Sequence, residues 1–116
     1  MNHKVCDALC LDTQANDGLA SDVSQVVDMN GMNAIQAEVV VYANTSSGAL
    51  TIQPQVSNDG VNWVDHSTSG SITAGDIGRQ VLGVVTPVAT SYARLYFTLA
   101  GTGKVIVDAH LAISKQ

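Results

Sequence analysis

The 116-residue chain has few charged residues, and few of those are cations. Charged residues make up 13% of it, against about 25% in an ordinary soluble domain. Five Lys and Arg stand against ten Asp and Glu, so the formal net charge is −5. Nucleic-acid affinity comes largely from cations that neutralise phosphates, and anionic membranes attract cationic proteins in the same way. We therefore expect neither nucleic acid nor a membrane as a partner.

Long apolar runs are also missing. No stretch approaches the roughly 18 residues that a transmembrane helix needs, and Asp7 interrupts the short apolar run near the N-terminus, which does not resemble a secretory signal. We expect synthesis in the cytoplasm, with a virion or another assembled shell as a later location. The apolar fraction of 46% is nonetheless sufficient for a hydrophobic core.

No arrangement of catalytic residues stands out. His66 lies between Asp65 and Ser67, but neighbours along a strand point to opposite faces of a sheet, and a Ser-His-Asp triad needs all three groups in contact. No glycine-rich phosphate loop precedes a helix, and no close pair of carboxylates indicates glycosidase chemistry. The sequence therefore predicts a protein that is not an enzyme and that uses no cofactor.

Two groups of residues carry metal-ligating atoms, and neither has the spacing of a known site. His3, Cys6 and Cys10, with Asp12, lack the paired Cys-x-x-Cys pattern of structural zinc sites. Oxygen atoms around Asp59 lack the ordered spacing of a calcium loop, and turn formation explains them more simply. We expect no metal site. Reduced thiols, an interchain disulfide and metal binding all stay open for the two cysteines.

Beyond residue 22 apolar residues recur with a period of two, which is typical of β-strands. The alternation predicts strands over residues 35–43, 50–57, 79–85, 92–99 and 104–113. Six to eight such strands without a βαβ unit predict an all-β fold, an antiparallel β-sandwich for which a jelly roll is one topology. Residues 1–21 show weak helical spacing and then a polar, turn-rich stretch. We expect them to form a short N-terminal arm or leader outside the core, followed by a single β-sandwich domain over residues 22–116.

Turn chemistry predicts two hairpins. Asp59-Gly60 suits a two-residue type I′ turn, which would place Val56 opposite Trp63 and turn the indole into the core. Gly101-Thr102-Gly103 suits a three-residue turn that pairs the last two strands with matching faces. In that register Tyr96 lies opposite Asp108, and Arg94 lies opposite His110. The predicted core includes Val56, Trp63, Leu95, Phe97 and Val107.

Several larger side chains fall on the sides of their strands that face away from the core. They are Val40, Tyr42, Tyr92, Arg94, Tyr96 and Ile106. Gathered on one sheet they would form an interaction patch, although the leader or a long loop could also cover them. We interpret them as the interface of a homo-oligomer or larger protein assembly. The alternative is a carbohydrate-binding module that uses the outer tyrosines as a stacking platform.

Residues 56–63, VSNDGVNW, resemble the S-x-D-G-x-x-W hairpin of many small β-sandwich proteins, including phage virion components and discoidin-like carbohydrate modules. A discoidin domain is usually longer, and the sialidase Asp-box has one more residue between the positions of Asp59 and Gly60. Residues 93–113, with their Gly-Thr-Gly turn, are similar to repetitive β-rich phage structural proteins. The resemblance implies a non-enzymatic β-sandwich of a virion. Together with the weakly charged surface and the outer-face apolar residues, it leads us to expect a self-associating structural protein, capsid-associated or another shell component. It transfers no ligand-binding residue.

Overall fold

The computed structural model describes residues 2–14, 18, 20–66, 69–81, 83–84 and 87–116, which form strands and no helix. In chain order the strands are β1 (Asn2–Asp12), β2 (Ser21–Val23), β3 (Val27–Asp28), β4 (Ala34–Asn44), β5 (Leu50–Ser57), β6 (Val64–Asp65), β7 (Gly70–Ile72), β8 (Gly78–Val81), β9 (Tyr92–Leu99) and β10 (Lys104–Ser114). The described residues accordingly include no helix long and apolar enough to cross a membrane.

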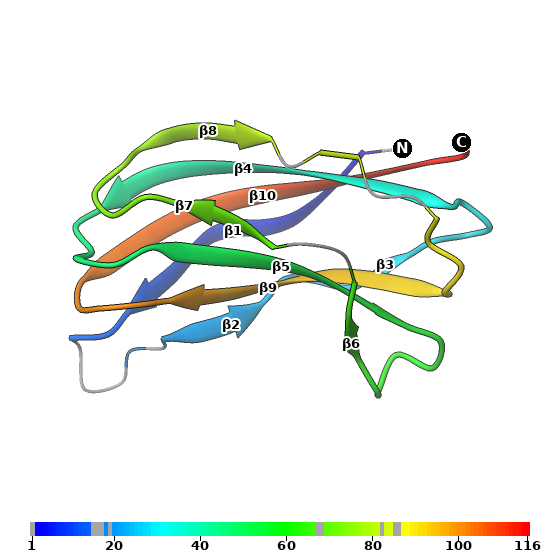
Figure 1. Ribbon diagram of the computed structural model, residues 1–116, viewed down its shortest axis with the longest axis horizontal. Helices are drawn as coiled ribbons and strands as arrows, with labels where there is room; N and C mark the ends of the chain where they lie inside the picture. Colours follow the sequence, from blue (N-terminus) through cyan, green and yellow to red (C-terminus); the bar gives the residue numbers. More distant parts are fainter. Residues whose placement is uncertain (1, 15–17, 19, 67–68, 82, 85–86) are drawn as a thin grey trace.

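The strands form two antiparallel sheets (Figure 1). One sheet has the order β1-β10-β4-β8, and the other has the order β2-β9-β5-β6, with β3 also paired to β9 and β7 to β5. The chain changes sheet at most of its connections, as it does from β4 to β5 and from β8 to β9. Four strands of each sheet, β1-β10-β4-β8 and β2-β9-β5-β6, follow the order of a jelly roll. The predicted all-β antiparallel sandwich is confirmed, and its topology is the jelly roll.

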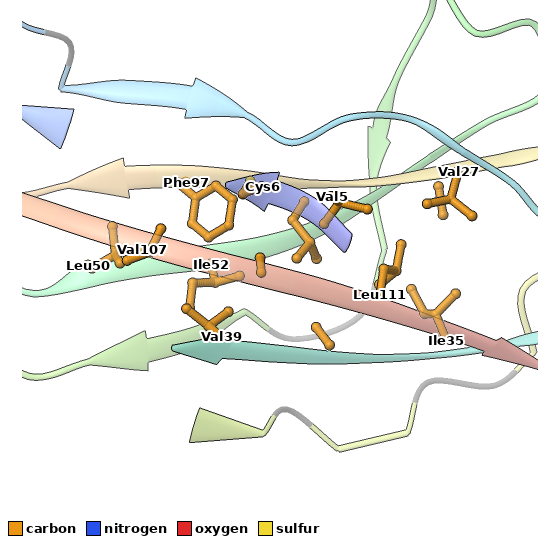
Figure 2. Close-up of a cluster of buried hydrophobic side chains, with 14 of the residues drawn as sticks. Val5, Cys6, Val27, Ile35, Val39, Leu50, Ile52, Phe97, Val107 and Leu111 are labelled. Atoms are coloured by element: carbon orange, nitrogen blue, oxygen red, sulfur yellow. The ribbon is translucent and has the colours of Figure 1, made fainter. Parts of the chain in front are cut away.

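The hydrophobic core lies between the two sheets, where alternate residues of the long strands point inward. Figure 2 shows Val39 and Val107 from one sheet beside Leu50, Ile52 and Phe97 from the other. Four of the five predicted core residues are fully buried: Val56, Leu95, Phe97 and Val107. Because the transfer of apolar surface out of water is the main driving force of folding, this shared interior holds the sheets together.

The N-terminal segment is part of the sandwich, so the predicted arm is wrong for residues 2–12. These residues form β1, which pairs with β10 along its length, and Val5 and Leu11 are buried in the core. Two register shifts interrupt the pairing between Lys4 and Leu9, and Ala8 has a positive φ of 52°. These bulges break the period of two, which is why the segment looked helical. Residues 1, 15–17 and 19 lie outside the described residues.

The last two strands belong to different sheets, so the predicted final hairpin is wrong. β9 pairs with β5 and β10 pairs with β4, and Gly101-Thr102-Gly103 carries the chain across the sandwich. Phe97 and Val107 nevertheless face the same core. The side of β9 that carries Phe97 and the side of β10 that carries Val107 both point inward, whether the connection is a hairpin within one sheet or a crossover between the two sheets. Gly103 has a φ of 134°, and a Cβ there would lie 2.5 Å from the Cα of Ser46. The crossover therefore packs closely on the β4–β5 loop.

Four other predicted strands are confirmed as β4, β5, β9 and β10, with ends that differ by at most one residue. The strand predicted over residues 79–85 is observed as β8, which ends at Val81; Leu82 and Val85 lie outside the described residues. Every residue of β8 is exposed. Within the described part of the chain β8 pairs only with β4, so it forms one edge of its sheet.

Candidate functional site

The six residues predicted to form an interface lie on two different outer faces of the sandwich. The sheet β1-β10-β4-β8 carries Val40, Tyr42 and Ile106 on its outer surface. Strand β9 of the other sheet carries Tyr92, Arg94 and Tyr96. We call these outer surfaces the β4 face and the β9 face. Because the core separates them, the six residues do not form one patch, and the two faces are considered in turn.

On the β4 face the carboxylate of Asp108 joins three strands. Tyr42 Oη donates a hydrogen bond of 2.6 Å to Oδ2, and the backbone N–H of Ala8 donates one of 2.7 Å to Oδ1. Lys4 Nζ lies 3.4 Å from Oδ2. The hydrogen bond from Tyr42, followed by that from Ala8, holds the pKa of Asp108 below its usual range. Both oxygens have donors, so Asp108 is a structural anchor rather than a free base.

Large apolar side chains are exposed where the β4 face meets β8. Tyr42 is 59% exposed, Ile77 69% and Val81 53%. Glu38 lies opposite Val81 in the pairing of β4 with β8, and at the other end of this pairing Val41 lies opposite Gly78, the residue after Ile77. Apolar residues scattered singly over a surface mean little, whereas a contiguous group indicates an interaction site. We call this group the β8 margin: Val40, Tyr42, Ile77 and Val81.

On the β9 face polar and aromatic side chains contact one another in a row. The guanidinium carbon of Arg94 lies 4.2 Å from the centroid of the Trp63 ring. Arg94 Nε donates a hydrogen bond of 2.9 Å to Gln55 Oε1, and Gln55 Nε2 donates one of 3.0 Å to Asp65 Oδ1. Tyr96 projects from the same side of β9 as Arg94. We call this set the Arg94 cluster: Gln55, Trp63, Asp65, Arg94 and Tyr96.

Trp63 lies half-buried outside the core, so its predicted core position is wrong. The pairing of β5 with β6 puts Val64, rather than Trp63, opposite Val56. The connection is therefore a longer loop than the predicted two-residue turn, and Trp63 projects beside Arg94. This shift reverses the expected direction of the indole, because successive residues point to opposite sides.

Asp59 builds the loop between β5 and β6. Its Oδ1 accepts hydrogen bonds of 2.8 Å from the backbone N–H groups of both Val61 and Asn62, and one of 2.9 Å from Ser57 Oγ. Asn62 Nδ2 donates to Oδ2 at 2.8 Å. These bonds, led by that from the Asn62 N–H, hold the pKa of Asp59 well below its usual range. The carboxylate is surrounded by donors, which is the environment of a loop anchor rather than of a cation ligand.

The residues weighed as a triad or a zinc site have other surroundings. His66 Nε2 lies 3.0 Å from the carbonyl oxygen of Pro87, Asp65 accepts from Gln55, and Ser67 lies outside the described residues. Cys6 is buried and Cys10 is exposed, and both are free thiols. Across the described residues, no group of three or more His, Cys, Asp and Glu side chains could hold a metal ion.

No known family model matches the chain, and no curated protein is similar to it in sequence. Several solved structures share its fold. The PBSX exported protein XepA aligns with a TM-score of 0.71 at 9% identity, covering 100% of this chain and 37% of XepA. This chain thus spans well under half the length of XepA.

Two further solved structures contain modules named as CBMs. A CBM4 structure aligns with a TM-score of 0.51 at 12% identity over 94% of this chain and 79% of its own. The CBM22-1 and GH10 modules of Clostridium thermocellum xylanase 10B, complexed with xylohexaose, align with a TM-score of 0.51 at 13% identity over 99% of this chain and 26% of theirs. At such low identity these similarities show the fold, a β-sandwich, and nothing finer.

Proposed function

We propose that the protein is a non-enzymatic building block of a protein assembly, in which copies of the chain associate through the β8 margin. The observation that carries the proposal is the grouping of Tyr42, Ile77 and Val81, each more than half exposed, along one edge of one sheet. Burial of apolar surface contributes about 25 cal/mol per Å². A second copy placed over this edge would remove these side chains from water.

The edge strand itself supports the same proposal. Among the described residues β8 has a partner strand on one side only, so the backbone groups on its other side are open to pairing with another chain. Arg79 Nε lies 3.4 Å from Glu38 Oε1 beside the β8 margin, so this edge carries one charge of each sign. A surface with both signs can be self-complementary about a twofold axis. These features favour a second copy as the occupant.

The wider setting we propose is a virion or another assembled shell. The resemblance of residues 56–63 to the hairpin of virion-type β-sandwich proteins supports it, as does the low content of charged residues. XepA, whose fold covers the whole of this chain, is an exported protein. The functional groups of Asp59 and Asp108 have structural partners, which supports a role in assembly rather than in catalysis.

The oligomeric state of the purified protein tests the proposal. We expect light scattering and native mass spectrometry to show a defined oligomer, and Ile77→Lys or Val81→Lys to shift it toward the monomer, because a buried lysine cation is costly. Val61→Lys is the matched control, since Val61 is 78% exposed in the β5–β6 loop, away from the margin. A wild-type protein that stays monomeric at high concentration would contradict the proposal. So would equal dissociation by the margin and control variants.

A further inference from the structure

Arg94 is a half-buried cation without a carboxylate counterion among the described residues. The ion pairs among the described residues have Lys4 or Arg79 as the cation. Burial lowers the pKa of Arg94, but a guanidinium stays charged at neutral pH. A partly desolvated charge is unfavourable unless a partner compensates it, and the Trp63 ring, which carries no charge, compensates this one only in part. The β9 face therefore presents a cation whose natural complement is an anion from outside the chain.

The guanidinium is also held in one orientation. The Trp63 ring stacks on its face, and Gln55 accepts from Nε, which fixes the plane and rotation of the group. Asp65 in turn fixes Gln55. Within the described residues the two terminal nitrogens of Arg94 have no hydrogen-bond acceptor. A pre-oriented pair of N–H₂ groups matches the two oxygens of a carboxylate, and less entropy is lost on binding.

The surroundings of this cation are aromatic and amide-rich rather than apolar. Tyr92, Arg94 and Tyr96 project from the same side of β9, about 7 Å apart from one to the next along the strand. Gln53 and Gln55 project from β5 opposite Tyr96 and Arg94, and both amides are already hydrogen-bonded within this chain. Aromatic rings can pack against the C–H faces of sugar rings. Such a row suits an extended chain of sugar units better than a compact anion.

We propose that the β9 face binds an acidic oligosaccharide, one whose sugar rings carry carboxylates as uronic acids do. Arg94 binds a carboxylate through its two terminal nitrogens, and the rings of Trp63 and Tyr96 contact the adjoining sugars. This site goes beyond the proposed assembly and is independent of it, because the β8 margin lies on the other sheet. The net charge of −5 opposes non-specific attraction of a polyanion, so binding should depend on Arg94 itself.

The position of the single tryptophan makes a direct test possible. Trp63 is the only tryptophan in the chain and contacts Arg94, so its fluorescence reports occupation of this site. We expect short oligogalacturonates to change the emission and to release or absorb heat in calorimetry. Neutral xylo-oligosaccharides of the same length and polyglutamate should do neither. The first comparison isolates the carboxylate, and the second isolates the sugar ring.

Variants assign the effect to Arg94. Arg94→Gln should weaken oligogalacturonate binding about 10- to 100-fold, as expected for loss of hydrogen bonds to a charged group. Arg94→Lys should also weaken it, because the charge remains but the paired donors are lost. Lys115→Gln is the matched control: it removes one exposed cation just beyond β10, which belongs to the other sheet, and it should bind as the wild type does.

Each contrary result overturns the proposal. These results are no response to oligogalacturonate in either measurement, an equal response to the neutral sugar or to polyglutamate, and equal weakening in Lys115→Gln. Circular dichroism confirms folding of each variant, and Arg94→Lys carries the test if Arg94→Gln does not fold. The oligomeric state of Arg94→Gln should match the wild type, so failure of saccharide binding and failure of assembly are distinguishable.

Discussion

The phenol of Tyr42 donates a 2.6 Å hydrogen bond to Oδ2 of Asp108, joining β4 to β10 on the β4 face. The N–H of Ala8 reaches the other oxygen of the same carboxylate from β1. One acidic side chain in the second strand of the sheet therefore joins the strands on both sides of it. Buried polar groups are tolerated when they are hydrogen-bonded, which explains how an aspartate can be buried at this position.

The pairing of Tyr42 with Asp108 predicts a pH-dependent effect of Tyr42→Phe. Because the pKa of Asp108 is lowered in the folded protein, its contribution to stability is present above the ordinary carboxyl pKa of about 4 and is lost as the pH falls through the lower folded value. We expect Tyr42→Phe to melt below the wild type at pH 7, and the difference to shrink in acid, at a pH well below the ordinary carboxyl pKa. Thermal melts at both pH values measure this.

Tyr96→Phe is the control for that experiment, because Tyr96 lies on the β9 face, away from Asp108. It should change the melting temperature little at either pH. A Tyr42→Phe deficit that is the same at pH 7 and at low pH would show that the carboxylate does not take part.

The positions of the long strands could be predicted because a period of two is a local property of sequence. The same alternation correctly predicted that Phe97 and Val107 face the core and that Arg94 and Tyr96 face outward. Strand partners could not be predicted in this way. A hairpin and a crossover at Gly101-Thr102-Gly103 give identical alternation, and strand pairing, of β9 with β5 and of β10 with β4, distinguishes them in the structure.

Much of the candidate site depends on loop geometry and sheet order, which the alternation of apolar and polar residues does not predict. The position of Trp63 follows from the hydrogen bonds that Asp59 accepts, which widen the loop beyond the expected two-residue turn. The exposure of Val81 follows from the position of β8 at the edge of its sheet, and the order of strands in the sheet decides that position. β1 was missed because the bulge at Ala8 breaks the alternation.

Phe97 and Trp63 should contribute differently to the free energy of unfolding. Phe97 is fully buried, so Phe97→Ala should lower the free energy of unfolding by about 3–5 kcal/mol. Trp63 is half-buried and packs mainly on Arg94, so Trp63→Ala should lower it by only about 1–2 kcal/mol. Urea denaturation followed by circular dichroism compares them. Equal losses would place the indole in the core after all.

Gly103 and Gly75 should respond differently to alanine although both have positive φ. Gly75, with a φ of 78°, has no atom within 4 Å of its missing Cβ, so Gly75→Ala should cost about 1–2 kcal/mol for the backbone conformation alone. At Gly103 a Cβ would also meet the Thr45 oxygen at 2.7 Å. Gly103→Ala should therefore cost about 3 kcal/mol or more. Similar urea midpoints for the two variants would contradict the close packing of the crossover.

The two cysteines should differ in their reactivity toward iodoacetamide. Cys10 is exposed, whereas burial, helped by the charges of Asp22 and Asp108, raises the pKa of Cys6 to about 12. The thiolate is the reactive form, so the native protein at pH 8 should take up one label, at Cys10, and Cys10→Ser should take up none. Mass spectrometry after peptide digestion locates the label.

The same labelling reports whether β1 stays in its sheet. Cys6 faces the core from β1, so it can react only if β1 leaves β10 or the whole domain unfolds. We expect labelling of Cys6 to follow the urea unfolding curve measured by circular dichroism, because β1 shares the core with both sheets. If Cys6 reacted well below the unfolding midpoint, at a rate near that of Cys10, residues 2–12 would detach separately. The segment would then behave as the arm expected from its sequence.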